Sequence, residues 1–472
     1  MALDEQRIAS IVAEVLERLD AGRAGRAGGS APLGVHPDLD RAVEAARSAF
    51  RAYERTPLET RRRIIASIRE ALSGQYDTLA ALAVEETGLG RREDKVEKNR
   101  LVTERTPGTE DLEPITWTGD RGLTLLERAP YGVIAVITPV TNPSETVINN
   151  GISMLAGGNT AVFCPHPSAR KVSILTLDIM NRAALAAGAP QPVLHTVEEP
   201  DIEVAKALLR YPGIRLNVVT GGAGVVKEAL AAGKKAITAG PGNPPAVVDE
   251  TADLDKAGRD LVAGSSFDNN IICTDEKEVV AVALVADRLK ESMVRAGAVL
   301  LAPHQTERLR RAVLHEERGP GRPAEVERRF VGRDAGRILA EVGIACDPAK
   351  RLALCEVDAD HPFVWTEMMM PILPLVRVRG VEEAIEYALR VEQGHHHTAS
   401  MHSRNIDMLS KMARECDCSI FVKNGPNYAG LGYGGEGPTS FTIASPTGEG
   451  MTTARSFTRV RRCTLVDHFR IV

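Results

Sequence analysis

Cys273 is the residue of this chain that is best placed to do chemistry. It ends the run S-S-F-D-N-N-I-I-C (265–273), which follows a predicted helix at 253–267 and precedes a predicted strand at 277–285. A thiol at such a junction can point into a cleft, with backbone N–H groups beside it to receive a developing oxyanion. Because a cysteine in a polar loop is more often an inert small residue, the rest of the chain must decide whether Cys273 is a nucleophile.

Two other turns could hold a phosphate or a cofactor. The turn T-G-G-A-G (220–224) follows a predicted strand and opens a predicted helix, where small residues let a diphosphate approach the helix N-terminus. In C-P-H-P-S (164–168), Pro165 and Pro167 fix the backbone around His166 directly after another predicted strand. Each segment also fits a plain turn, so each is a weak signal alone.

Two conspicuous motifs lack the context of their usual chemistry. A literal G-x-G-x-x-G at Gly432, Gly434 and Gly437 runs into a proline rather than a helix, so we predict a loop near the active cleft. The run 395–397, three histidines, has no second ligand cluster, and adjacent side chains project in different directions. A structural or substrate-lining role is favoured there, and no metal is expected.

Composition narrows the functional classes. The chain has 472 residues, a net charge of −5, 43% hydrophobic and 4% aromatic residues, which disfavours nucleic acid as a partner. Seven scattered cysteines make no disulfide framework and indicate a reducing, cytoplasmic setting. No apolar stretch is long enough to span a bilayer, and the N-terminus does not read as a secretory signal, so no membrane partner is expected.

A regular alternation of strands and helices dominates the first half of the chain. Strands are predicted at 133–138, 160–164, 192–196, 214–219 and 235–239, with helices between them at 145–156, 168–187, 201–210 and 223–232. Continuous apolar strands alternating with helices predict a buried parallel sheet covered on both faces, which binds ligands at the carboxyl ends of its strands. Two helical segments, 38–53 and 58–86, and a polar stretch to about 114 precede it.

The first twenty residues form a separate unit in the pattern. Apolar residues at positions 8, 11, 12, 15, 16 and 19 share one helical face, and the glycine-rich segment that follows reads as a tether. This helix either packs on the main domain or docks in a partner groove. Membrane binding is disfavoured, because the helix carries five acids against two arginines.

A second α/β region, which carries Cys273, begins near residue 246. Residues 115–128 are predicted to form a β-excursion that turns at Gly119-Asp120, and the C-terminal segment is predicted to form a closing strand. Exposed strands of this kind seek partners, which favours a homo-oligomer, either a dimer or a tetramer.

Taken together, the motifs resemble the aldehyde dehydrogenase superfamily from residue 37 to 472. The matching pieces are I-T-P-V-T-N-P (137–143), T-G-G-A-G (220–224), the loop around Cys273 and T-E-M-M-M-P-I-L-P (366–374). The resemblance implies that Cys273 attacks an aldehyde, that hydride then passes to NAD, and that Glu367 holds the nicotinamide ribose. It places the oxyanion donor at Asn142, although a gapless match to the family's turn gives Thr141 instead.

One departure from the family decides the second half-reaction. Hydrolytic members carry a glutamate that activates water, and A-G-P-G-N-P-P (239–245) places Ala239 there. Loss of a general base slows water attack by about 10²–10⁴-fold, so the thioester can wait for coenzyme A. This segment and V-F-C-P-H-P (162–167) are similar to the CoA-acylating branch. The N-terminal helix and tether look like the encapsulation peptide of microcompartment propionaldehyde and acetaldehyde dehydrogenases, which implies a shell protein as partner and the microcompartment lumen as location.

These inferences predict a CoA-acylating aldehyde dehydrogenase for short aliphatic aldehydes, propionaldehyde first and acetaldehyde second. The alternatives are a hydrolytic aldehyde dehydrogenase and a catalytically silent, shell-associated scaffold. The fold expected is α/β: a Rossmann-like cofactor domain, an α/β catalytic domain and a small β oligomerisation element. The expected domains are an encapsulation helix at 1–20, a linker at 21–36, an NAD- and CoA-binding domain at 37–245, a catalytic domain at 246–430, and an active-site loop with the C-terminal strand at 431–472. The expected cofactor contacts are Thr138, Pro139, His166, Pro167, Thr220, Gly221, Gly222, Gly240, Pro241, Gly242, Glu367 and Pro371.

Overall fold

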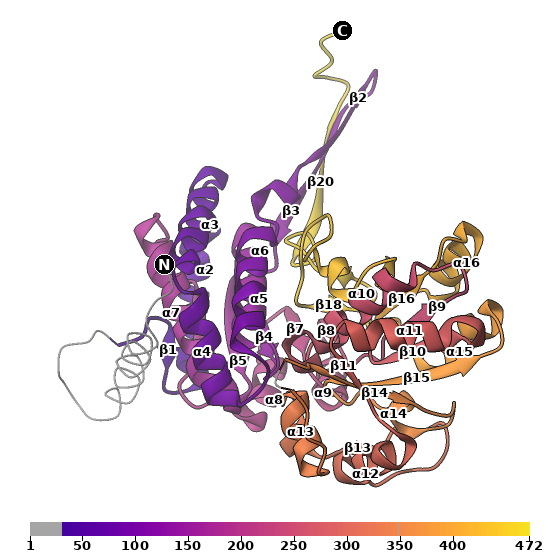
Figure 1. The fold of residues 1–472 in the computed structure, drawn as a ribbon. Coiled ribbons are helices and arrows are strands. Elements are labelled where there is room, and N and C mark those ends of the chain that lie inside the picture. Colours follow the sequence, from indigo (N-terminus) through magenta and orange to yellow (C-terminus); the bar gives the residue numbers. More distant parts are fainter. Residues whose placement is uncertain (1–30, 348) are drawn as a thin grey trace. The chain divides into compact units, whose positions relative to one another are not determined.

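The apolar segments between residues 133 and 239 form one parallel sheet in the computed structural model, which describes residues 31–472 except residue 348 (Figure 1). The helix predicted at 1–20 lies outside these described residues. The strands are β1 (Val35–His36), β4 (Val133–Thr138), β5 (Thr160–Pro165), β6 (Leu194–Val197), β7 (Leu216–Thr220) and β8 (Lys235–Ala239). Their spatial order is β1-β6-β5-β4-β7-β8, so strand order reverses between β4 and β7. Open α/β sheets bind ligands at such a switch point.

Helices pack against this sheet because their apolar stripes match its buried strands. One cluster of buried side chains joins β4 to α2 (Leu39–Tyr53), α8 (Ile202–Arg210) and α9 (Ala223–Leu230). The helices α6 (Pro143–Ala156) and α7 (Arg170–Ala186) contact β5 and β6, and α3 (Leu58–Ser73) and α4 (Tyr76–Thr87) contact α7. The segment predicted as one helix at 58–86 is two helices, because α3 stops at Gly74.

Two differences from the predicted elements have a physical reason. The polar stretch before residue 114 contains α5 (Arg92–Arg105). This helix is not evident from the sequence, because its mean hydropathy is low and it has no apolar stripe. Its inward residues Lys95, Lys98 and Asn99 are polar and fully buried. The linker was predicted to run to 36, but the last two of those residues form β1 and pair with β6.

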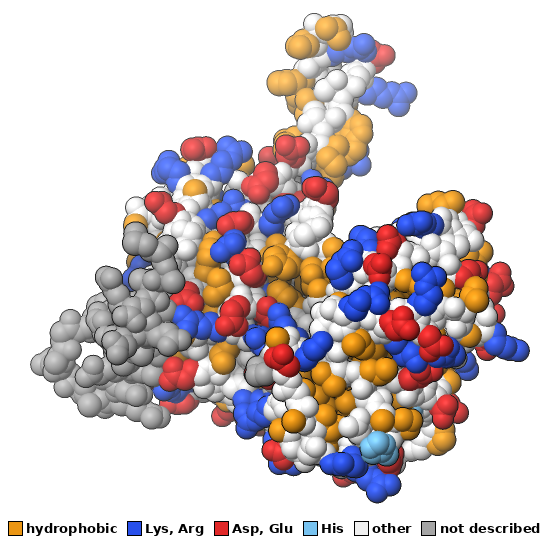
Figure 2. All heavy atoms as spheres, viewed as in Figure 1, with side chains coloured by type: hydrophobic (Ala, Val, Ile, Leu, Met, Phe, Trp, Pro, Cys, Tyr) orange, Lys and Arg blue, Asp and Glu red, His pale blue; other side chains and the backbone are white. Residues whose placement is uncertain are grey.

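A three-stranded antiparallel sheet joins the β-excursion to the C-terminus. It contains β2 (Ile115–Gly119), β3 (Gly122–Pro130) and β20 (Thr458–Val466), in the order β2-β3-β20. Large apolar side chains stay exposed on these strands, including Trp117, Val460 and Leu465, and hydrophobic side chains are visible along this ribbon in Figure 2. A short hairpin, β18 (Ile443–Ala444) and β19 (Gly450–Met451), precedes β20.

The region around Cys273 is built on a second, seven-stranded parallel sheet. Its strands are β9 (Pro245–Val248), β10 (Glu278–Val282), β11 (Ala298–Leu300), β14 (Leu352–Glu356), β15 (Ile372–Val378), β16 (Thr398–His402) and β17 (Ile420–Lys423), in the order β11-β14-β15-β10-β9-β16-β17. Its helices are α10 (Leu254–Ser266), α11 (Ala283–Arg295), α12 (Pro303–Val313), α13 (Ala335–Glu341), α14 (Pro362–Trp365), α15 (Val381–Val391) and α16 (Ile406–Cys416), and β12 (Leu314–His315) pairs with β13 (Glu325–Val326). The strand predicted at 277–285 stops at Val282, because the apolar residues after it belong to α11.

The chain groups into two units that each have their own core. The first contains the described residues up to Thr87, Val96–Ala239 and Pro438–Val472; the second contains Gly88–Lys95 and Gly240–Gly437. The C-terminal segment therefore belongs to the unit of the first sheet, and residues 88–95 belong to the unit of Cys273. Among the described residues, no helix is long and apolar enough to cross a membrane.

Candidate active site

Gly242 is the point in the second unit where the predicted site residues meet. A Cβ added at Gly242 would lie 2.9 Å from Cγ of His397 and 3.0 Å from the carbonyl oxygen of Cys273. The Gly242 N–H donates to Oε1 of Glu367 at 3.4 Å. The turn that replaces the hydrolytic glutamate segment therefore touches both the cysteine loop and the Glu367 carboxylate, and only glycine fits this space.

The charges around Cys273 control its ionisation. Burial and the Glu367 carboxylate raise the pKa of the Cys273 thiol to about 12, and Lys277 acts in the opposite direction. The Lys277 ammonium donates to the carbonyl oxygens of Asn270 and Ile272 and to Oδ1 of Asn270, so it is held under the cysteine loop. Burial also raises the pKa of Glu367. In this state the sulfur is a protonated thiol, and its reactivity depends on the balance of Glu367 and Lys277.

His397 is a buried residue beside this centre. Its Nδ1 lies 2.9 Å from Oγ1 of Thr398, and its backbone N–H donates to Oε1 of Glu392 at 3.0 Å. Nε2 has no hydrogen-bond partner among the described residues. Burial lowers the pKa of His397 to about 3, so the ring is neutral, and one of its two nitrogens donates while the other accepts.

Aromatic rings pack against the start of the cysteine loop. The ring centroids of Phe267 lie 5.2 Å from Tyr428 and 5.3 Å from Tyr433, and those of the two tyrosines lie 5.2 Å apart. Phe267 is buried and both tyrosines are half-buried. The glycine-rich loop at 432–437 thus carries one of these tyrosines, and Gly432, Gly434 and Gly437 have the positive φ that turns require.

In the first unit, a buried lysine orients Asn142. The Lys98 ammonium donates to Oδ1 of Asn142 at 2.7 Å and pairs with Glu145 at 3.1 Å. Nδ2 of Asn142 donates to Oγ1 of Thr141 at 3.1 Å. Since a side-chain amide has two N–H donors, this arrangement commits one of them and fixes the direction of the other. Asn142 and Thr141 are therefore hydrogen-bonded to each other, and the Asn142 amide is the donor of this hydrogen bond.

The remaining predicted contacts of the first unit lie along the carboxyl edge of its sheet. Thr138 ends β4, His166 follows β5, and Thr220 ends β7, on both sides of the switch point. Oγ1 of Thr220 lies 2.9 Å from Oγ1 of Thr442. His166 is exposed, and its Nδ1 accepts from the backbone N–H of Ser168. The glycine turn before α9 has an exposed Gly222, beside which an added Cβ would meet nothing within 4 Å.

The predicted site residues are divided between the two units. Gly240, Pro241, Gly242, Cys273, Glu367 and Pro371 belong to the second unit, whereas Thr138, Pro139, Thr141, Asn142, His166, Pro167, Thr220, Gly221 and Gly222 belong to the first. Pro371 is buried, and its carbonyl oxygen accepts from the N–H of Ala353 in the sheet. Sequence reasoning did not single out Lys98 or Lys277, because neither lies in an apolar pattern that would mark a buried side chain, and for His397 it favoured a structural or substrate-lining role.

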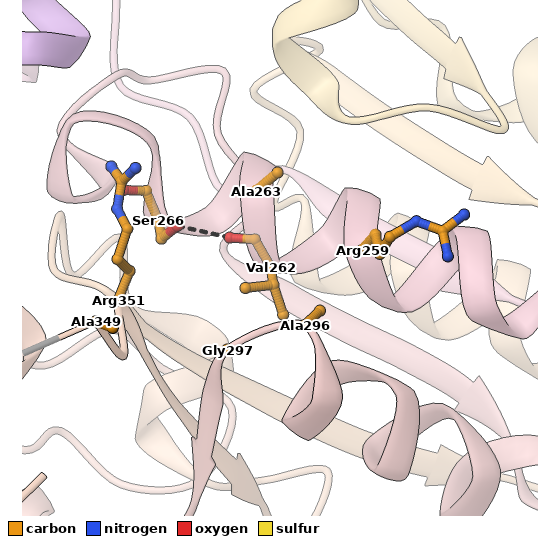
Figure 3. A pocket seen from close by; sticks show the side chains of 8 residues that line it. All are labelled: Arg259, Val262, Ala263, Ser266, Ala296, Gly297, Ala349 and Arg351. Atoms are coloured by element: carbon orange, nitrogen blue, oxygen red, sulfur yellow. Dashed lines mark hydrogen bonds between the residues drawn. The ribbon is translucent and has the colours of Figure 1, made fainter. Parts of the chain in front are cut away.

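A separate cavity of about 250 Å³ lies in the second unit between the end of α10 and the turn at 296–297 (Figure 3). Arg259 and Arg351 flank its walls, which are otherwise formed mainly by small residues. None of the predicted site residues lines it. The side chain of Arg351 runs along one wall toward Ser266, at the start of the cysteine loop.

Comparison with known proteins shows the family to which the chain belongs. The family model described as "Aldehyde dehydrogenase family" matches residues 20–308, and the chain belongs to this family. The fold class and the family predicted from the sequence are thereby confirmed.

Individual relatives narrow the position within the family. The chain is 54% identical to the acetaldehyde dehydrogenase (acetylating) EutE of Salmonella typhimurium, over 93% of this chain and 94% of that protein. It is 46% identical to the propanal dehydrogenase (CoA-propanoylating) of the same organism, over 93% of each. A crystal structure of Rhodopseudomonas palustris propionaldehyde dehydrogenase with bound CoA and an acylated cysteine matches with a TM-score of 0.89 and 48% identity, over 92% of this chain and 98% of that one.

Proposed function

We propose that this chain is a CoA-acylating aldehyde dehydrogenase, which converts a short aliphatic aldehyde, CoA and NAD to acyl-CoA and NADH. The observation that carries the proposal is Gly242, against which the Cys273 backbone, the Glu367 carboxylate and the His397 ring converge. The names of the relatives support it, since they act on acetaldehyde or propanal and are acetylating or CoA-propanoylating. Identity is higher to the acetaldehyde enzyme, so both aldehydes belong in the test.

The first step is attack of Cys273 Sγ on the aldehyde carbonyl to give a thiohemiacetal. The thiol loses its proton as the C–S bond forms, and a proton ends on the former carbonyl oxygen of the thiohemiacetal. The Lys277 ammonium is the positive group whose field favours the thiolate. The negative charge that develops on the aldehyde oxygen needs a donor aimed at it before the reaction begins. The family resemblance leads us to propose Nδ2 of Asn142 for that role, and within the first unit Lys98 and Thr141 already fix this amide.

The residues at the sheet edge fit a dinucleotide. Oγ1 of Thr138 and Oγ1 of Thr238 are buried without a hydrogen-bond partner among the described residues, at the ends of β4 and β8. The exposed Gly222 turn opens α9, where N–H groups suit a diphosphate. We expect Thr138, Thr220 and Gly222 to hold the dinucleotide and Glu367 to hold the ribose of its nicotinamide half. When bound, NAD supplies the hydride acceptor that turns the thiohemiacetal into a thioester on Cys273.

The thioester then passes its acyl group to CoA rather than to water. Ala239 offers no base for water, whereas a thiol with a pKa near ~8.5 ionises appreciably at neutral pH without one. We propose that the neutral His397 ring, whose Nε2 has no hydrogen-bond partner among the described residues, contacts the incoming thiol. These features favour acyl transfer to CoA over hydrolysis to the free acid.

The remaining expectations concern partners and location. The exposed apolar side chains of β2 and β20 support a homo-oligomer formed through this ribbon, as a dimer or a tetramer. Residues 1–20 are proposed to bind a shell protein, which would place the enzyme in the lumen of a bacterial microcompartment in the cytoplasm. A similar solved structure, a propionaldehyde dehydrogenase of a Clostridium phytofermentans fucose utilisation microcompartment, supports this, with a TM-score of 0.90 and 44% identity over 93% of this chain and 100% of that one.

The test measures NADH and acyl-CoA formation from acetaldehyde and propionaldehyde, with and without CoA, in the wild type and in Cys273→Ala. CoA-dependent NADH formation with acyl-CoA as product, abolished in the variant, is the expected result. Turnover without CoA that yields the free acid would refute acyl transfer and favour a hydrolytic enzyme. No turnover under any condition would favour the scaffold.

A further inference from the structure

The loop that carries Cys273 adopts a backbone conformation that needs external support. Asp268, Asn269 and Asn270 are three consecutive non-glycine residues with positive φ, at 46°, 57° and 65°. Aspartate and asparagine tolerate the left-handed region better than other residues with a side chain, but each still departs from the favoured conformations. Such a run persists only where surrounding contacts determine it.

Asp268 is anchored by a segment that lies about 175 residues earlier in the chain, at 88–95, within the same unit. Its Oδ1 accepts from the backbone N–H of Arg91 at 2.7 Å, and its Oδ2 accepts from Nζ of Lys95 at 3.0 Å. The Lys95 and Asp268 side chains are 1% and 0% exposed, so the pair is shielded from solvent. Gly90 lets the carboxylate approach, since a Cβ there would lie 2.0 Å from Oδ1.

A second ion pair holds the backbone of the same residue. The N–H of Asp268 donates to Oδ2 of Asp94 at 2.9 Å, and Asp94 pairs with Arg351. Arg351 also donates to the carbonyl oxygen of Ser266 at 3.1 Å and borders the open cavity of Figure 3. Its side chain is 34% exposed, so water reaches this outer pair but not the inner one.

The anchor is transmitted to Cys273 along a short, fully bonded stretch. Nδ2 of Asn269 donates to the carbonyl oxygen of Gly332, and Nδ2 of Asn270 donates to those of Ser265 and Glu276. Only Ile271 and Ile272 separate these amides from the cysteine, and both are buried. The position of Sγ is therefore set by the conformation at 268–270.

We propose that Lys95, acting through Asp268, is a positioning residue for the Cys273 thiol; this rests on the proposed role of Cys273 as the nucleophile. In this role Lys95 acts by fixing the left-handed run at 268–270. Loss of its ammonium leaves Asp268 as a buried carboxylate without that partner, and the run relaxes. Misplacement of a reacting atom by about 1 Å lowers turnover by roughly 10²-fold while binding sites remain intact.

The experiment compares Lys95→Met and Asp268→Asn with a matched control, Lys290→Met, in the full-length enzyme. Lys290 pairs with Glu356 and Asp287 in the same unit and makes none of the hydrogen bonds of the 268–273 loop. For Lys95→Met we expect kcat to fall about 10²-fold, whereas KM for propionaldehyde stays within about twofold of the wild-type value. The rate at which iodoacetamide alkylates Cys273 should also differ from that of the wild type, because the thiol is displaced. The control keeps kcat within about twofold, because a partly exposed pair contributes little.

Asp268→Asn covers the case in which Lys95→Met does not fold. It keeps an oxygen for the Arg91 N–H and the tolerance for positive φ, but it removes the charge that Lys95 holds. The same split of kcat against KM is expected. A soluble Lys95→Met or Asp268→Asn enzyme with wild-type kcat, or with a loss matched by Lys290→Met, would overturn the proposal.

The Cys273→Ala variant separates the positioning role of Lys95 from the proposed role of Cys273 as the nucleophile. If it abolishes turnover while Lys95→Met does not, the positioning role fails alone. If it retains CoA-dependent turnover, the proposed nucleophile fails, and the site-specific alkylation rates of Lys95→Met still decide whether Lys95 positions the thiol.

Discussion

Replacement of Glu367 by glutamine should make the Cys273 thiol more reactive while it weakens cofactor binding. The carboxylate is the largest influence on the thiol after burial, and it raises the pKa toward the value of about 12. At pH 7.5 a thiol of that pKa is ionised in roughly one molecule in thirty thousand, against about 9% for an ordinary thiol with a pKa of about 8.5. We therefore expect slow alkylation of Cys273 in the resting enzyme.

The size of the effect follows from two opposing trends. Removal of one neighbouring negative charge lowers a pKa by about one unit, which raises the thiolate population about tenfold at pH 7.5. The intrinsic nucleophilicity of the thiolate falls by about threefold over the same unit. We therefore expect Glu367→Gln to be alkylated by iodoacetamide about three- to fourfold faster, whereas KM for NAD rises about tenfold with the loss of a charged acceptor.

The assay follows carboxamidomethylation of the peptide that contains Cys273 by mass spectrometry from pH 7 to 10, since other thiols such as the exposed Cys463 also react. Glu356→Gln is the matched control, because Glu356 pairs with Lys290 and Arg377 and does not perturb Cys273. The wild-type rate should rise with pH without a plateau near 9. An unchanged or slower rate in Glu367→Gln, or an equal gain in Glu356→Gln, would refute the electrostatic argument.

Three further outcomes are expected. Gly90→Ala should lower the melting temperature by several degrees, because Gly90 has φ +78° and the added Cβ meets the Asp268 carboxylate. The control Gly74→Ala should not lower it, because Gly74 has φ −83° and a Cβ there meets nothing within 4 Å. Equal melting temperatures of the two variants would contradict this expectation. Burial lowers the pKa of His195 to about 3, so its contribution to the free energy of unfolding is present above pH 6.5 and is lost as the unfolded chain takes up the proton, by about 2 kcal/mol at pH 5. His195→Gln should therefore flatten the dependence of the melting temperature on pH between 6.5 and 4. An unchanged slope would be the contrary result. Deletion of residues 1–20 should leave kcat unchanged and abolish co-purification with shell proteins; loss of activity in a normally assembled enzyme would show that the segment belongs to the fold.

Local sequence predicted the first sheet well because its strands are buried on both faces. The helix between β4 and β5 and the strand after it lie within two residues of their predicted bounds, since continuous apolar runs and turn residues mark them directly. The pattern failed for α5, whose buried face is polar, and for the end of β10, where the apolar run continues into a helix. In both places tertiary packing overrides the local signal.

For the candidate site, too, some features could be predicted from the sequence and others depend on tertiary structure. The sequence by itself determined the chemistry: a cysteine in a loop between helix and strand, a glutamate before a buried strand, and an alanine where hydrolytic members have a base. These are statements about residue types at fixed chain positions, and they do not depend on coordinates.

Only the tertiary structure decided the environment of those groups. It brought His397 against Gly242, placed Lys277 beneath the cysteine loop and joined Lys95 to Asp268 across about 170 residues of chain. No periodicity in the sequence marks such contacts, because burial of a charged side chain depends on a partner supplied by a distant segment. The sequence therefore named the candidate reacting groups, and the fold set their ionisation and their surroundings.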